Sequence, residues 1–268
     1  NCNNLTISNL DTLTINAPTP ATDALKIRRD LTNNGLLRVI SGYSTQVTYG
    51  SGALSSTTST PFKATATDAR TQIIYSAAEL QQAGLIAGDK ITGLQFTVTA
   101  KGSLSPYNGF TVSYALVSFA TQFTSATPNN SALTTVYGPV AYSTVAGLNT
   151  INLNTPIVWD GINSILVQYC YNNTSTTGAS NDVILYTQTT GIGSTLNLST
   201  TSNVLSGCAL TAPLAGVSDN FFAGTKSYRP NFTFNIVRPY SKVNINVQED
   251  WINNNSFIAG YSRVEFDS

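Results

Sequence analysis

The sequence contains no histidine and no methionine, and only 10% of its residues are charged. Without histidine, the chain cannot build a Ser-His-Asp or Cys-His catalytic group or a histidine-based zinc site. No glycine-rich phosphate loop stands between a strand and a helix. The few carboxylates are not spaced to pair on one strand, as a glycosidase would need. These absences predict a protein that is not an enzyme.

The charge pattern also excludes several classes of partner. The 13 basic and 13 acidic residues give a net charge of zero, and no basic stretch exceeds the pair Arg28 and Arg29. Nucleic-acid binding depends on clustered Lys and Arg, so we expect no nucleic-acid partner. No apolar run approaches the roughly 18 residues of a membrane span.

The composition indicates where the protein works. With so little charge, Ser, Thr, Asn and Gln must supply the polar surface, and this is common in secreted β-proteins. At 41% hydrophobic content, 268 residues are enough to bury a real core. Because the chain lacks Met and begins at Asn1, we expect a processed protein or an excised fragment. We predict an extracellular or cell-surface location.

Helical signals are confined to one short segment near 77–83. Ser76 and Glu79 form a predicted capping box, and Gly84 is a stop signal. Elsewhere, alternating apolar residues separated by turn signals predict strands, without helices between them. This pattern favours an all-β fold, an antiparallel β-sandwich. The predicted strands cover 91–100, 110–119, 135–142, 149–153, 164–171, 183–187 and 231–237.

Both ends of the chain are strand-rich and differ from the middle. We therefore divide the chain into an N-terminal segment (1–41), a core module (42–237) and a C-terminal tail (238–268). The ends predict extra terminal strands that form a second small sheet, extend the sandwich or pair with another molecule. An open strand edge can complete a neighbour's sheet. The candidate assembly strands carry Leu5, Ile7, Leu13, Ile15, Val243, Ile245 and Val247.

Three cysteines are present: Cys2, Cys170 and Cys208. In a secreted chain we favour a disulfide between Cys170 and Cys208 over two buried thiols. It would add about 3–4 kcal/mol in the chain-entropy model. Cys2 is then left to pair with a neighbouring chain or an upstream domain, or to stay free.

Two kinds of binding site have candidate residues. Tyrosines near loop signals can stack on sugar rings, although β-sandwich cores also use Tyr. These candidates are Tyr43, Tyr49, Tyr107, Tyr142 and Tyr228. Loop carboxylates can bind calcium, although Asp is also a common turn residue. These candidates are Asp160, Asp182 and Asp219, and we expect no other cofactor.

The middle of the chain contains an ordered series of short sequence blocks. They include ARTQIIYSAAEL at 69–80, PIVWDG at 156–161 and ILVQYCYN at 165–172. Further blocks lie at 60–62, 83–84, 88, 91–96, 135–137, 148–152, 206–208 and 229–232. Together they resemble the β-sandwich modules of secreted, cell-surface, adhesin-like Bacteroidota proteins exported by the type IX route. The resemblance covers roughly 42–237. It implies a jelly-roll-like sandwich with Cys170 and Cys208 bridged.

Within these blocks, Trp159 is predicted to be buried at a strand end, followed by a tight turn at Asp160 and Gly161. Arg70 and Arg229 are predicted to be structural anchors. We therefore expect a non-enzymatic structural or adhesive protein, either a module of a surface adhesin or a subunit of an extracellular filament assembled by strand exchange. The alternative is a carbohydrate-binding module. The expected partners of this protein are other copies of itself, neighbouring modules or surface glycans.

Overall fold

The computed structural model describes residues 2–16, 25–40, 43–56, 60–118, 123, 125, 127–130, 132–189, 194–202, 206–211, 222–238, 243–258 and 262–266. The chain divides into two compact units. The sandwich unit is Gln46–Ile236, and the terminal unit combines Asn1–Thr45 with Val237–Ser268. The predicted core boundaries lie within a few residues of these. The two ends, predicted as separate segments, belong to one unit.

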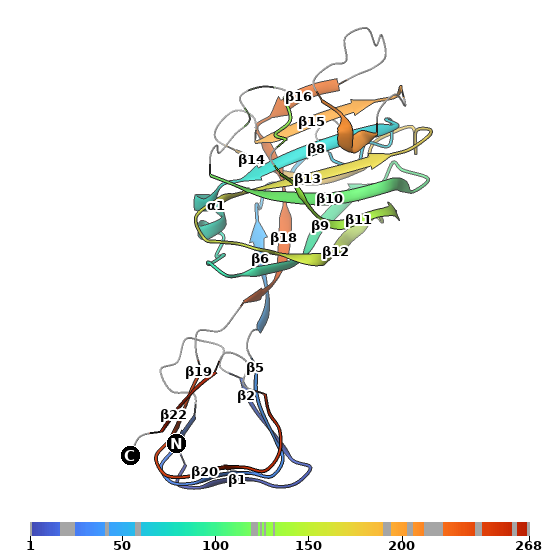
Figure 1. The fold of residues 1–268 in the computed structure, drawn as a ribbon. Coiled ribbons are helices and arrows are strands. Elements are labelled where there is room, and N and C mark those ends of the chain that lie inside the picture. The colour runs from blue at the N-terminus through green and yellow to red at the C-terminus, as the bar shows by residue number, and fades with distance from the viewer. Residues whose placement is uncertain are drawn as a thin grey trace. The chain divides into compact units, whose positions relative to one another are not determined.

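The sandwich unit is the predicted all-β sandwich of two sheets (Figure 1). The six-stranded sheet has the order β11 (Thr134–Tyr142), β10 (Tyr107–Val117), β13 (Ser164–Asn172), β8 (Asp68–Tyr75), β15 (Thr195–Thr200), β16 (Phe222–Lys226). The seven-stranded sheet has the order β17 (Tyr228–Pro230), β14 (Val183–Gln188), β9 (Lys90–Ala100), β18 (Phe232–Arg238), β6 (Tyr43–Tyr49). In addition, β12 (Gly147–Val158) pairs with β9, and β7 (Leu54–Ser56) pairs with β14.

Aromatic side chains fill the core between these sheets. Phe62 is fully buried, and its ring centroid lies 4.9 Å from that of Phe96 and 5.8 Å from that of Phe110. Trp159 is also fully buried and donates its indole N–H to the Asn163 carbonyl at 2.8 Å. Such rings bury large apolar areas, so they dominate the core energetics.

The central strands of the six-stranded sheet, β13, β8 and β15, are buried on both faces, because loops cover their outer side. Arg70 anchors these loops, as predicted: it donates to the Leu210 carbonyl at 2.8 Å and to Asn130 Oδ1 at 2.9 Å. The predicted disulfide joins Cys170 of β13 to Cys208 of the 3₁₀ helix η1 (Gly207–Ala209). A side chain at Gly207 would lie 1.8 Å from the Tyr171 carbonyl, so only glycine allows this close approach.

The predicted helix is α1 (Ala77–Gln82), and its capping box is present. Ser76 accepts a hydrogen bond from the Glu79 backbone, and the Glu79 carboxylate accepts one from the Ser76 backbone at 3.0 Å. Glu79 also forms an ion pair with the buried Arg229, which donates to the Tyr49 hydroxyl at 3.0 Å. Arg229 is thus the second predicted anchor, tying β17 to α1 and β6.

The terminal unit is a parallel β-helix of three small sheets, which form three sides of a triangle in Figure 1. One sheet has the order β1 (Leu5–Ile7), β4 (Leu31–Asn33), β20 (Trp251–Asn253). The second has the order β2 (Thr12–Asn16), β5 (Leu36–Ile40), β21 (Phe257–Ile258). The third has the order β22 (Ser262–Phe266), β19 (Val243–Val247), β3 (Leu25–Ile27). Every strand pair is parallel.

Successive turns of this β-helix stack in register although they come from opposite ends of the chain. Leu31 pairs with Leu5 on one side and with Trp251 on the other. Asn33 donates its amide to Asn253 Oδ1 at 2.7 Å, which continues the stack through side chains. The interior is apolar, and its fully buried side chains are Ile27, Leu31, Leu37, Ile245 and Val247.

The sandwich unit is inserted into the sequence of the β-helix. It lies between β5, which ends at Ile40, and β19, which begins at Val243. Elsewhere in the β-helix, β3 follows β2 and β22 follows β21 along the chain with no other strand between them. At the sandwich side, β6 and β18 are neighbours in one sheet, so the chain enters and leaves on adjacent strands.

Candidate functional site

Most of the predicted sugar-contacting tyrosines are core residues. Tyr49, Tyr107 and Tyr142 are only 8%, 0% and 9% exposed. Tyr228 is half-buried and packs against the same core. Tyr43 lies in β6, but its side chain is outside the described residues. The prediction is therefore corrected for the three buried rings, because their strands turn them inward.

Asp182, a predicted calcium ligand, is instead the centre of a buried hydrogen-bond network. Its Oδ1 accepts from the backbone N–H groups of Gly102 and Ser103 at 2.7 and 2.8 Å. Its Oδ2 accepts from the hydroxyls of Thr144 at 2.6 Å, Ser103 at 3.0 Å and Tyr107 at 3.0 Å. Donors occupy both oxygens, whereas a calcium site needs converging acceptors. The structure assigns Asp182 to this network.

The environment of Asp182 favours its charged form. Burial by itself raises the pKa of Asp182, but the hydrogen bonds from Thr144, Ser103 and Gly102 outweigh it. The net result is a pKa below the ordinary value. The carboxylate therefore stays charged and joins three loops of the sandwich.

The other two calcium candidates do not complete a site. Asp160 is exposed and accepts from the backbone N–H groups of Ile162 and Asn163 at 3.0 and 2.9 Å. It closes the predicted turn, in which Gly161 has a φ of +84°. Asp219 lies outside the described residues. In the described part of the chain, no three acidic, cysteine or histidine side chains cluster as metal ligands would.

The predicted assembly strands pair within their own chain. Both edges of β19, which carries Val243, Ile245 and Val247, are occupied by β3 and β22. β1, which carries Leu5 and Ile7, and β2, which carries Leu13 and Ile15, each pair on one side, with β4 and β5. This corrects the prediction for β19: it has no edge to donate, because the ends of the chain stack on each other. Ile7, Ile245 and Val247 are buried inside the β-helix.

The last described turn of the β-helix, formed by β20, β21 and β22, carries a cluster of aromatic side chains. Trp251 of β20 contacts Phe257 of β21 and Phe266 of β22, with ring centroids 5.0 and 6.2 Å apart. Phe266 is 62% exposed. The Trp251 indole nitrogen is buried and has no hydrogen-bond partner. At the other end, the outermost described strands are β1, β2 and β3, and Cys2 forms a β-bridge with Ile27 of β3.

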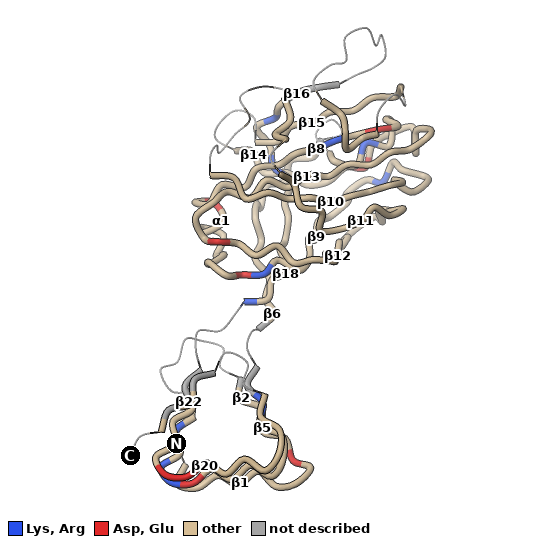
Figure 2. The backbone as a smooth tube through the Cα atoms, in the orientation of Figure 1, with Lys and Arg blue, Asp and Glu red and all other residues tan. Residues whose placement is uncertain are grey.

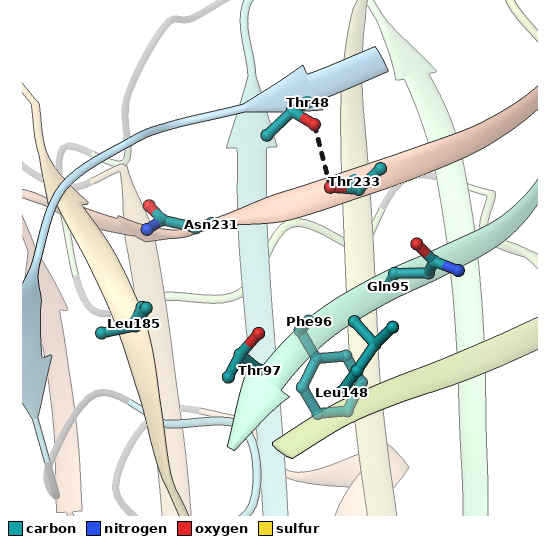
Figure 3. A pocket seen from close by; sticks show the side chains of 8 residues that line it. All are labelled: Thr48, Gln95, Phe96, Thr97, Leu148, Leu185, Asn231 and Thr233. Carbon is teal, nitrogen blue, oxygen red and sulfur yellow. Dashed lines mark hydrogen bonds between the residues drawn. The ribbon is translucent and has the colours of Figure 1, made fainter. Parts of the chain in front are cut away.

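A polar groove is the second feature with binding potential, and it lies on the seven-stranded sheet (Figure 3). It has a volume of about 170 Å³. Its lining comes from five strands or their ends: Thr48, Gln95, Phe96, Thr97, Leu148, Leu185, Asn231 and Thr233. Phe96 faces the core, and the other side chains are at least partly exposed. None of the lining side chains is ionisable, in keeping with the few charges that Figure 2 shows along the backbone.

None of these groove residues was predicted from the sequence to bind a ligand. The available signal was the polar side of the 91–100 strand, where Gln95 and Thr97 alternate with buried residues. That signal reports an exposed face but not a hollow in it. The aromatic end of the β-helix was also missed, because Trp251 and Phe257 were assigned only to a terminal strand region.

No protein-family model matches the sequence, and no curated protein matches it. Two solved structures show limited likeness to the chain. One holds the cysteine protease and lectin-like domains of Cwp84, a surface-layer-associated protein of Clostridium difficile. It is 12% identical with a TM-score of 0.34, over 65% of this chain and 32% of that one. The other is the clostridial cysteine protease Cwp84 after propeptide cleavage. It is 11% identical with a TM-score of 0.36, over 72% and 40%.

The chain thus covers 32–40% of the length of these two structures. Likeness at this level defines neither a family nor a function for it. No helix in the described residues is long and apolar enough to cross a membrane.

Proposed function

We propose that this chain is a non-enzymatic, extracellular structural or adhesive module in which a parallel β-helix carries an inserted β-sandwich. The observation that supports this most is the insertion itself. The β-helix keeps its register across residues 41–242, with Leu31 of β4 paired to Trp251 of β20. A β-helix that continues through such an insertion is suited to carry a separately folded domain within a repetitive structure.

The extracellular location is supported by chemistry. The Cys170–Cys208 disulfide closes a loop in the sandwich, and such bonds persist in oxidising compartments. The low charge and the resemblance to secreted Bacteroidota modules support the same location. On the strength of that resemblance, our proposal includes export by the type IX route and an adhesin-like role.

We further propose that copies of the chain, or neighbouring modules, associate by stacking β-helix turns end to end. The outermost strands described at the two ends are β1, β2 and β3, with Cys2 bridged to Ile27 of β3, and β20, β21 and β22. A strand at the end of a sheet offers backbone groups that a further strand can pair with. The exposed Phe266 would be covered by the stacked neighbour. Head-to-tail stacking does not close on itself, so it produces a filament.

The test is the assembly state of the full chain, measured by light scattering over a concentration series and by electron microscopy. We expect concentration-dependent growth into filaments for the native chain. Phe266→Lys places a charge at the stacking surface and should abolish this growth. The control is Leu104→Lys, which changes a 90% exposed residue of the sandwich unit and should assemble normally. A native chain that stays monomeric at every concentration, without fibres, refutes the assembly proposal.

A further inference from the structure

The groove on the seven-stranded sheet lies where β14 separates from β9. In the sheet order, β9 lies between β14 and β18. The ladder between β14 and β9 is limited to Val183↔Ala100 and Ile184↔Val98, with a register shift between the two pairs. β14 then continues along β17 instead. Such an irregularity bends the strand and interrupts the ladder, which leaves a hollow on the outer face.

The polar groups of the groove are held in place before any ligand arrives. The Asn231 amide donates to the Gly52 carbonyl at 2.7 Å, and its oxygen accepts from the Thr187 hydroxyl at 2.6 Å. Thr48 and Thr233 share a hydrogen bond of 3.0 Å, drawn in Figure 3. Fixed groups lose little entropy on binding, so this arrangement favours affinity.

Other polar groups of the groove keep free hydrogen-bonding capacity. The Gln95 oxygen accepts from the Gln46 amide at 3.1 Å. Among the described residues, the Gln95 amide nitrogen and the Thr97 hydroxyl have no hydrogen-bond partner. Beside them, Leu148 holds a large apolar side chain 62% exposed at the edge of the hollow. The groove thus combines amide and hydroxyl groups with one apolar wall.

We propose that this groove binds a neutral oligosaccharide, with one sugar unit in the hollow. Sugar hydroxyls match the donors and acceptors of Gln95, Thr97 and Thr233, and the C–H face of the ring would lie against Leu148. A charged ligand would lose hydration here without any opposite charge to replace it. A volume of about 170 Å³ is below the roughly 300–1,000 Å³ typical of drug-sized ligands, which favours a single ring over a larger compact molecule.

The site differs from the tyrosine site predicted from the sequence and uses none of its residues. It also lies in the sandwich unit and does not depend on stacking of the β-helix. A failure of the assembly experiment therefore leaves this proposal standing, and the reverse also holds.

The test screens the full chain against an array of neutral and acidic glycans and then measures each hit by titration calorimetry. We expect neutral glycans to bind with a Kd of about 0.1–1 mM, the weak range near −4 to −5.5 kcal/mol. Thr97→Trp fills the hollow and should abolish binding, and Leu148→Ser should weaken it at least fivefold. Both changes are at exposed positions, so the thermal midpoint should stay near that of the native chain.

The matched control is Thr134→Ala, at an exposed threonine of β11 in the six-stranded sheet, away from the groove. It should bind as the native chain does. The proposal is overturned if no neutral glycan binds at millimolar concentration, if only acidic glycans bind, or if Thr97→Trp binds as tightly as the native chain.

Discussion

Replacing Asp182 tests whether the buried carboxylate network holds the sandwich together. Asp182→Asn keeps the shape and leaves Oδ1 able to accept from the Gly102 and Ser103 backbone. The new amide can donate to the hydroxyls of Thr144 and Tyr107, but the charge is lost. Hydrogen bonds to charged groups contribute about 1.5–3 kcal/mol each, and they do not add fully. We therefore expect a loss of about 2–3 kcal/mol in the free energy of unfolding.

The assay is urea unfolding followed by tryptophan emission. The chain has two tryptophans, Trp159 in the sandwich core and Trp251 in the β-helix. A Trp251→Phe background therefore reports on the sandwich alone. Asp160→Asn is the control, because Asp160 is exposed and Asn can keep its turn hydrogen bonds. It should change the free energy of unfolding by less than about 0.5 kcal/mol.

The pH dependence gives a second readout. The pKa of Asp182 is lowered in the folded state, so its charge stabilises the fold above the unfolded pKa. This contribution is lost as pH falls through the folded pKa. The Asn variant does not titrate there, so the gap between native and variant should narrow in acid. A loss below about 0.5 kcal/mol at neutral pH, or a gap that stays constant into acid, refutes this account of Asp182.

Two further changes test the two units separately. Replacing Cys170 and Cys208 by Ser should cost about 3–4 kcal/mol in the sandwich transition, because the closed loop of 38 residues no longer restricts the unfolded chain; equal urea midpoints for this variant and the native chain contradict it. Leu31→Ala should cost about 2–5 kcal/mol in the β-helix transition, reported by Trp251 in a Trp159→Phe background, because Leu31 is fully buried. An unchanged β-helix transition would show that Leu31 is not a core residue.

Local features of the sandwich followed from the sequence because each depends on neighbouring residues. The capping box of Ser76 and Glu79 needs only a spacing of three residues, and the turn at Asp160 and Gly161 needs only a positive φ. The alternation of 91–100 placed Phe96 and Val98 inside. By contrast, the direction of the predicted tyrosines was misjudged. Turn signals near Tyr107 and Tyr142 suggested loops, but both residues lie in strands that face the core.

The groove also could not be predicted from the sequence. Thr97 lies in β9, Leu148 in β12 and Asn231 between β17 and β18, and they line one hollow only because β14 leaves β9 after two residue pairs. This register shift depends on how β14 divides its pairing between β9 and β17. The alternation of any single strand does not encode it.

The sequence by itself determined that the two ends of the chain are strands and which of their side chains seek an apolar interior. Ile7, Ile245 and Val247 are buried, as the alternation of their strands predicts. Only the tertiary structure decided what these strands pair with. Backbone hydrogen bonds are the same for any partner strand, and the inserted sandwich hides the repeat that would have revealed the β-helix. Leu31 therefore meets Trp251, 220 positions further along the chain, because closing the β-helix around one apolar interior buries both ends together.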